Sequence, residues 1–221
     1  MSRPFIGFYG FWAALTFLSV ASAIAGMRFA LGGDIGYAIV CLMVCGLCDM
    51  FDGTVARRAK RTKREEGYGI HLDSLADIVS FGALPVVIGY AASPHYLPHN
   101  YGSIGAIASI VVSAIYVLAA LVRLSYYTVI EVELQSKNEK RTYYEGLPVT
   151  FVALIIPIVY SICLFFGIAF STVYNAMLFI ISVLFVLRVR LPAMKGYQRI
   201  VLLFIGLPII VYLVWNIGAG I

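Results

Sequence analysis

Long apolar blocks alternate with short polar segments along the whole chain. Each block is roughly twenty residues long, which is the length of helix that crosses a hydrocarbon core of about 30 Å. Backbone polar groups in lipid must be paired within their own segment, and the blocks lack the polar–apolar alternation of barrel strands, so each is predicted to be a helix. The predicted spans, about seven in number, cover roughly residues 7–31, 35–52, 70–92, 102–124, 148–168, 172–188 and 199–219.

Composition agrees with a membrane protein. Of the 221 residues, 62% are hydrophobic and 12% are charged, about half the charged fraction of a soluble globular chain, and the mean hydropathy is +0.93. No internal repeat or polar domain interrupts the blocks, so residues 1–221 are predicted to form a single all-α, polytopic transmembrane domain. The first block is predicted to be retained, since no small-residue cleavage site follows a short apolar core.

Of the 16 Lys and Arg residues, 15 lie on one side of the predicted topology, and Arg28 is the exception near the opposite face. Six lie between Arg57 and Arg64, four between Arg123 and Arg141, and four between Arg188 and Arg199; these segments share a face with Arg3. In membrane proteins the cytoplasmic loops carry the excess of basic residues. We therefore expect this protein to lie in the cytoplasmic membrane with these basic segments facing the cytoplasm. Basic charge beside spans also attracts anionic headgroups, so membrane lipids rather than nucleic acid are the predicted partners.

Four of the 11 acidic residues lie in or against apolar blocks: Asp49, Asp52, Asp73 and Asp77. An ionised side chain at bilayer depth costs about 2.5–3.5 kcal/mol, so these four are predicted to line a polar cavity near the cytoplasmic surface and to be neutralised by cations. Each pair is spaced three or four residues apart and therefore shares a helix face. Oxygen ligands suit Mg²⁺ or Mn²⁺, and four carboxylates exceed the need of one ion, so a two-metal site is predicted.

Small residues flank the aspartates. Gly53 and Ala56 lie about one and two turns beyond Asp49, and Gly69 lies one turn before Asp73. They permit close approach either of a ligand or of a neighbouring helix, and beside the carboxylates we favour the ligand. Arg57 is one turn beyond Gly53, where it can meet a phosphate. A two-metal site here suits a pyrophosphate substrate, with a remaining carboxylate to accept a proton from an attacking hydroxyl.

Three cysteines, Cys41, Cys45 and Cys48, share one helix face and offer an alternative metal site. A lone helix face without a fourth ligand is a poor cage for Zn²⁺. We therefore predict that these residues and Cys163 are small packing residues of the core.

The segment from Asp49 to Arg57 (DMFDGTVAR), followed by Gly69-x3-Asp73-x3-Asp77, resembles the signature of CDP-alcohol phosphotransferases, D-x2-D-G-x2-A-R-x8-G-x3-D-x3-D. Eleven residues rather than eight separate Arg57 from Gly69, so the connecting loop departs from the family pattern while both helical halves keep their spacing.

The resemblance implies a fold and a reaction. Members transfer a phosphatidyl-type group from a CDP-linked lipid to an alcohol and release CMP. Their matching aspartates bind two divalent metals, the position of Asp77 is the general base, and the positions of Gly53 and Ala56 accept the nucleotide. Their core has six transmembrane helices, commonly in a homodimer, so a seventh span would be an addition.

Three segments point to the acceptor. The stretch Leu72–Gly82, the pair Arg123-Leu124 and the stretch Tyr143–Pro148 are similar to membrane-embedded phosphatidylserine synthases, although Tyr127 and Thr128 stand where Phe and Asn are common. The likeness implies CDP-diacylglycerol and L-serine as substrates. The candidate acceptor-binding residues are Arg123, Tyr144, Gly146 and Pro148.

Several alternatives stay open at this point. Arg123 can bind the serine carboxylate or merely anchor a helix end by snorkelling. Glycerol 3-phosphate or inositol phosphate are rival acceptors, and the basic loops can supply the cations they need. A divalent-metal transporter would place its carboxylates near the midplane, whereas these four are predicted at one membrane edge. A catalytically dead scaffold would be expected to lack one of the aspartates.

Overall fold

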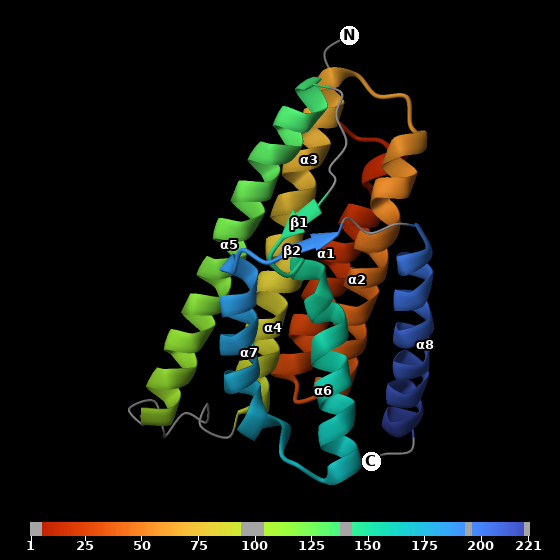
Figure 1. Cartoon of the computed structure of the whole chain (residues 1–221). Coiled ribbons are helices and arrows are strands. Elements are labelled where there is room, and N and C mark those ends of the chain that lie inside the picture. Colours follow the sequence, from red (N-terminus) through yellow and green to blue (C-terminus); the bar gives the residue numbers. More distant parts are fainter. Residues whose placement is uncertain (1–5, 94–103, 138–142, 193–195, 219–221) are drawn as a thin grey trace.

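The computed structural model describes residues 6–93, 104–137, 143–192 and 196–218, and nearly all of them are helical (Figure 1). The long helices lie side by side. Their bounds are η1 (Phe11–Ala13), α1 (Ala14–Leu31), α2 (Ile35–Arg58), α3 (Lys63–Asp77), the π-helical η2 (Ile78–Ala83), α4 (Leu84–Ala92), α5 (Ile104–Lys137), η4 (Val149–Phe151), α6 (Val152–Phe166), α7 (Phe170–Val186) and α8 (Gly196–Gly218).

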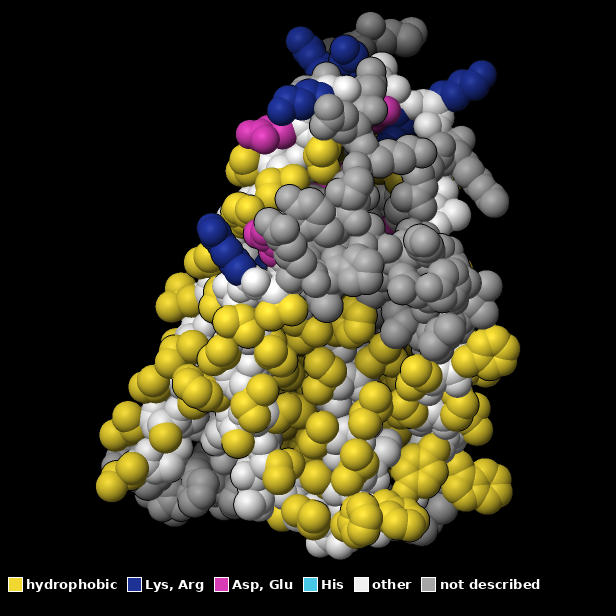
Figure 2. Space-filling model, viewed as in Figure 1, with side chains coloured by type: hydrophobic (Ala, Val, Ile, Leu, Met, Phe, Trp, Pro, Cys, Tyr) yellow, Lys and Arg dark blue, Asp and Glu magenta, His cyan; other side chains and the backbone are white. Residues whose placement is uncertain are grey.

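The predicted all-α membrane fold is confirmed, and each predicted span has a helical counterpart. Hydrophobic side chains cover the lower part of the molecule, and Lys and Arg side chains lie above them (Figure 2). Among the residues described in full, five segments are long and apolar enough to cross a membrane: Phe11–Leu31, Ile35–Ala56, Lys63–Ala92, Ile104–Leu134 and Val149–Phe166. Helix α7 is also apolar, but its 17 residues are short for a span.

Three helices extend further than hydropathy predicts, and the first of them, expected to end near residue 52, continues to Arg58. The helix expected near residue 70 begins at Lys63, because Thr62 and Glu65 form a capping box at the amino end of α3. The helix expected to end near residue 124 continues to Lys137. These polar turns are supported by packing rather than by lipid: Ser74 of α3 and Thr128 of α5 share a hydrogen bond of 2.6 Å.

The third span is interrupted by π-helical turns immediately after Asp77. Pro85 has no backbone N–H to offer to the carbonyl of Phe81, four residues earlier. Tyr116 of α5 donates its hydroxyl to that carbonyl at 2.5 Å, and Tyr174 of α7 donates to the Pro85 carbonyl at 2.6 Å. Both tyrosines are buried where no water can replace these bonds, so they fix α5 and α7 against the third span.

A short ribbon, which the sequence did not predict, joins the segments that flank α6 and α7. Strands β1 (Tyr143–Glu145) and β2 (Arg190–Pro192) pair antiparallel. The turn after β1 needs glycine at Gly146, where φ is +73° and a Cβ would lie 2.8 Å from the Phe185 carbonyl oxygen. This close contact with the end of α7 directs the chain into η4 and α6.

Gly89→Ala is expected to destabilise the bundle by about 1–3 kcal/mol, the usual cost of overpacking a filled core. A Cβ on Gly89 of α4 would lie 2.5 Å from Cε1 of Tyr174, so the ring would have to leave its position against Pro85. Thermal unfolding in detergent measures the effect. Gly67→Ala is the control, since no atom lies within 4 Å of a Cβ there. Equal unfolding temperatures for both variants would contradict the tight packing of Tyr174.

Candidate active site

The aspartates of α2 and α3 meet in one cavity of about 860 Å³. Residues of α2, α3, α5, α6 and α8 line it, and Trp12 of η1 contributes one side. Asp49, Asp52, Asp73 and Asp77 all line this cavity. The structure therefore brings together the four carboxyl groups that the sequence singled out, from two helices that the loop 59–62 connects.

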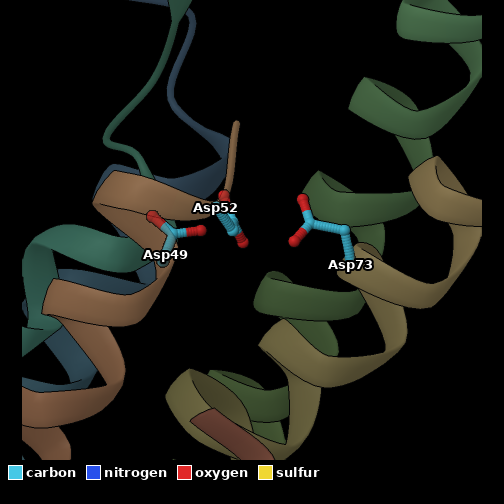
Figure 3. Close-up of side chains that lie close together, drawn as sticks. All are labelled: Asp49, Asp52 and Asp73. Carbon is cyan, nitrogen blue, oxygen red and sulfur yellow. The ribbon is translucent and has the colours of Figure 1, made fainter. Parts of the chain in front are cut away.

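Three of these carboxyl groups form a compact cluster. Asp49 and Asp52 project from α2 toward Asp73 of α3 (Figure 3), and one oxygen of each lies within 4.8 Å of the others. Carboxylates this close repel one another strongly in a poorly hydrated site unless a cation lies among them. Oxygen atoms are the ligands that Mg²⁺ and Mn²⁺ prefer, so this donor set fits a divalent metal ion.

Asp77 lies one helical turn beyond Asp73, at the carboxyl end of α3, and lines the same cavity. The charges of the other three aspartates disfavour a negative charge on Asp77, and the positive charge of Arg123 favours it. Asp77 is not one of the three carboxyl groups whose oxygens lie within 4.8 Å of one another, and it lies next to the π-helical turns of η2. A carboxyl group in this place lies next to the candidate metal-binding cluster and close to a cationic side chain.

The small residues predicted to admit a nucleotide lie on the walls of the cavity. Gly53 and Ala56 line it from α2, and Gly69 lines it from α3. Arg57 belongs to α2, but its side chain lies outside the residues that the structure describes. A ligand can therefore approach the backbone of α2 closely beside the carboxyl cluster, whereas Arg61 and Trp12 lie over Gly69 of α3.

Arg123 is not a snorkelling anchor, because α5 continues for several turns beyond it and its side chain is only 7% exposed. The guanidinium lies 4.5 Å above the ring of Tyr127, one turn further along the helix, and lines the cavity. Such a stacked guanidinium is held in a fixed orientation and presents its donors to the cavity.

The segment from β1 to η4 brings a further predicted residue to this wall. The Tyr127 hydroxyl donates to the Glu145 carbonyl at 2.6 Å, and Pro148, three residues later, lines the cavity. Gly146 is buried between them and does not line the cavity, so its part is to shape the turn. Tyr144 lies in β1, and its side chain is outside the described part of the chain.

The lining residues that the sequence did not single out include Trp12, Arg61 and Glu131. Glu131 repeats the four-residue spacing of Arg123 and Tyr127, a signal that was missed because α5 was predicted to end near residue 124. Trp12 and Arg61 lie outside the motif and come together only through the fold. Three of the four cysteines, Cys45, Cys48 and Cys163, are buried, Cys41 is partly buried, and the Cys45 thiol donates to the Ser19 carbonyl.

The family model named CDP-alcohol phosphatidyltransferase matches residues 13–188, which include every aspartate of the site. The chain belongs to the CDP-alcohol phosphatidyltransferase family. The matched range ends before α8, so the last helix lies outside the region that this family shares. The predicted family and its transferase class are confirmed.

Named relatives within the CDP-alcohol phosphatidyltransferases cover much of the chain. Archaetidylserine synthase of Methanothermobacter thermautotrophicus is 26% identical over 82% of this chain and 69% of its own length. CDP-diacylglycerol–serine O-phosphatidyltransferase of Helicobacter pylori is 27% identical over 81% of this chain and 71% of its own. The Saccharomyces cerevisiae protein of the same name is 32% identical over 71% of this chain, but only 51% of that longer protein is matched.

Proposed function

We propose that this chain transfers a phosphatidyl group from CDP-diacylglycerol to the hydroxyl of L-serine, forming phosphatidylserine and releasing CMP. The observation that carries the proposal is one cavity that holds four aspartates and the buried Arg123. The names of the relatives, which are serine phosphatidyltransferases and an archaetidylserine synthase, support serine as the acceptor.

Asp49, Asp52 and Asp73, with Asp77, would hold two divalent ions, Mg²⁺ or Mn²⁺. When bound, such ions stabilise negative charge on phosphoryl oxygens and on a departing phosphate. The clustering of the first three carboxyl groups within 4.8 Å supports this assignment. Below the cluster, Phe81, Leu84 and Ile88 are completely buried, so the described interior is closed by apolar side chains as in an enzyme site and unlike an ion pathway.

The chain's own residues carry the proton transfer. In the proposed reaction the serine hydroxyl oxygen bonds to the phosphorus that bears diacylglycerol. The bond from that phosphorus to the bridging oxygen breaks, and CMP leaves with the electron pair. Asp77 accepts the hydroxyl proton, because it lies at the edge of the cluster and beside Arg123 rather than among the three clustered carboxyl groups.

The cavity has one polar and one apolar end, which suits a lipid joined to a nucleotide. Gly53 and Ala56 leave room for the cytidine nucleotide, Gly69 lines the cavity beneath the Arg61 guanidinium, and Arg57 is on the same helix as the first two. Away from the aspartates, α2, α6 and α8 contribute apolar lining. We assign this end to the diacylglycerol portion, with lining residues Leu47, Leu154, Leu207 and Ile210.

Serine requires a cation for its carboxylate, and the stacked guanidinium of Arg123 supplies one beside Asp77. Pro148 lines the same region, Gly146 positions it, and Tyr144 is the remaining candidate from β1. The distribution of Lys and Arg supports a cytoplasm-facing cavity. The homodimer expected from the family resemblance remains a prediction.

Purified protein with CDP-diacylglycerol and Mn²⁺ is expected to release CMP when L-serine is added. Glycerol 3-phosphate and inositol phosphate, tested separately, are expected to give far less, since the named relatives are serine phosphatidyltransferases and an archaetidylserine synthase. Release is followed together with the lipid product by chromatography. CMP release with glycerol 3-phosphate but not serine would overturn the acceptor, and no release with any alcohol would overturn the reaction.

A further inference from the structure

Arg61 lies outside the family motif, in the lengthened loop between the two motif halves, yet its side chain lines the cavity. The backbone on both sides of it is fixed. The amide of Ala59 closes the end of α2 by donating to the Ala56 carbonyl, and the Thr62–Glu65 capping box begins α3. A loop residue held between two such caps is positioned almost as firmly as a residue within a helix.

The Arg61 side chain is also fixed. Its guanidinium carbon lies 5.5 Å from the centre of the Trp12 ring, and Trp12 is itself 7% exposed. The Nε atom of Arg61 is buried and has no hydrogen-bond partner among the described residues. Buried donors in native proteins nearly always have an acceptor, so a guanidinium left in this state inside a cavity points to a ligand that brings the acceptor.

The position of Arg61 identifies which part of a ligand this is. A Cβ on Gly69 would lie 3.1 Å from Nη1 of Arg61, so the guanidinium lies over Gly69. Gly69 is one helical turn before Asp73, and Asp77 is one turn after it. Arg61 and Arg123 therefore act at opposite ends of the carboxylate row, Arg61 at the Gly69 end and Arg123 at the Asp77 end.

The reaction geometry assigns the two ends. In phosphoryl transfer the attacking and the leaving oxygens lie roughly in line on opposite sides of the phosphorus. If Asp77 and Arg123 receive the acceptor alcohol, the leaving nucleotide lies at the opposite end, over Gly69. We propose that Arg61 binds the phosphate of the cytidine nucleotide and stabilises the charge it gains as CMP leaves. This inference rests on the proposed function for its choice of ends, but its test does not depend on turnover.

The test compares Arg61→Met with Lys60→Met, which removes the same charge from an exposed side chain on the same loop. CMP binding is measured by calorimetry in detergent with Mn²⁺ present. Loss of a charge-assisted hydrogen bond is expected to weaken CMP binding by roughly 10- to 100-fold in Arg61→Met, with Lys60→Met close to the wild type. Binding of cytidine, which has no phosphate, is expected to be equally weak in all three proteins.

Steady-state kinetics supply the second readout. The KM for CDP-diacylglycerol is expected to rise in Arg61→Met while the KM for serine changes less than about twofold. A raised KM for serine with unchanged CMP affinity would overturn the assignment and place Arg61 in the acceptor site. Equal weakening of cytidine and CMP would overturn the phosphate contact in favour of the base.

Two further outcomes separate this inference from folding defects and from the proposed function. Arg61→Lys keeps the charge and the stacking chain but lacks Nε, so its CMP affinity is expected to fall between those of the wild type and Arg61→Met. If Arg61→Lys bound CMP as tightly as the wild type, a hydrogen bond from the guanidinium to the phosphate would be ruled out. If no alcohol supports CMP release but Arg61→Met still weakens CMP binding selectively, the nucleotide site stands and the proposed reaction falls.

Discussion

Asp73→Asn is expected to lower the rate of CMP release by roughly 10²–10³-fold at fixed Mn²⁺, because metal stabilisation of a phosphoryl transition state is worth several kcal/mol. Asp73 is the member of the carboxylate cluster that α3 supplies, and it faces Asp49 and Asp52 across the cavity. Asparagine keeps the shape and one oxygen but removes the negative charge that holds a cation. Initial rates are measured over a wide range of Mn²⁺ concentration.

The dependence on metal distinguishes a ligand from a merely structural residue. In Asp73→Asn the Mn²⁺ concentration for half-maximal activity is expected to rise, and chelation is expected to abolish activity in the wild type until Mn²⁺ is restored. Asp34→Asn is the control, because Asp34 is an exposed acidic residue at the other end of α2. If Asp73→Asn and Asp34→Asn had the same metal dependence, the cluster would not be a metal site.

The convergence of the aspartates could be predicted because the evidence is local. Spacings of three and four residues place Asp49 with Asp52, and Asp73 with Asp77, whatever the rest of the chain does. A short loop then returns the chain to the same membrane surface, so the two pairs must approach each other. What spacing could not show is that Asp73, rather than Asp77, clusters with Asp49 and Asp52 within 4.8 Å, since this depends on how α3 rotates against α2.

The rest of the site depends on contacts between distant segments. Trp12 and Arg61 are separated by many residues, and neither lies in a periodic pattern that would pair them. Hydropathy also did not predict the full length of α5, because its outer turns are polar and are supported by contacts such as that of Ser74 with Thr128. Hydropathy detects the lipid-facing part of a helix and not its continuation into water, and that continuation carries Glu131.

The π-helical turns after Asp77 show the same limit in the core. Pro85 within a predicted span indicates that the Phe81 carbonyl lacks its usual helical hydrogen bond and needs another donor. The sequence does not say that the partner is Tyr116 of α5, because aromatic residues are abundant in every span. These long-range bonds fix the carboxyl end of α3, and with it the position of the proposed base.

Asp77→Asn is expected to lower kcat by roughly 10²–10⁴-fold even at saturating Mn²⁺, which is the usual contribution of a general base. Asparagine cannot accept the serine proton, but the clustered carboxyl groups of Asp49, Asp52 and Asp73 are unchanged, so CMP and CDP-diacylglycerol binding are expected to be largely retained. Single-turnover rates and CMP affinity are measured for Asp77→Asn beside Asp73→Asn. If added Mn²⁺ restored the kcat of Asp77→Asn, Asp77 would be a metal ligand and not the base. If Asp77→Asn turned over at the wild-type rate, Asp77 would have no part in the mechanism. A loss of kcat that no metal concentration restores, with CMP affinity intact, would place the proton transfer at Asp77.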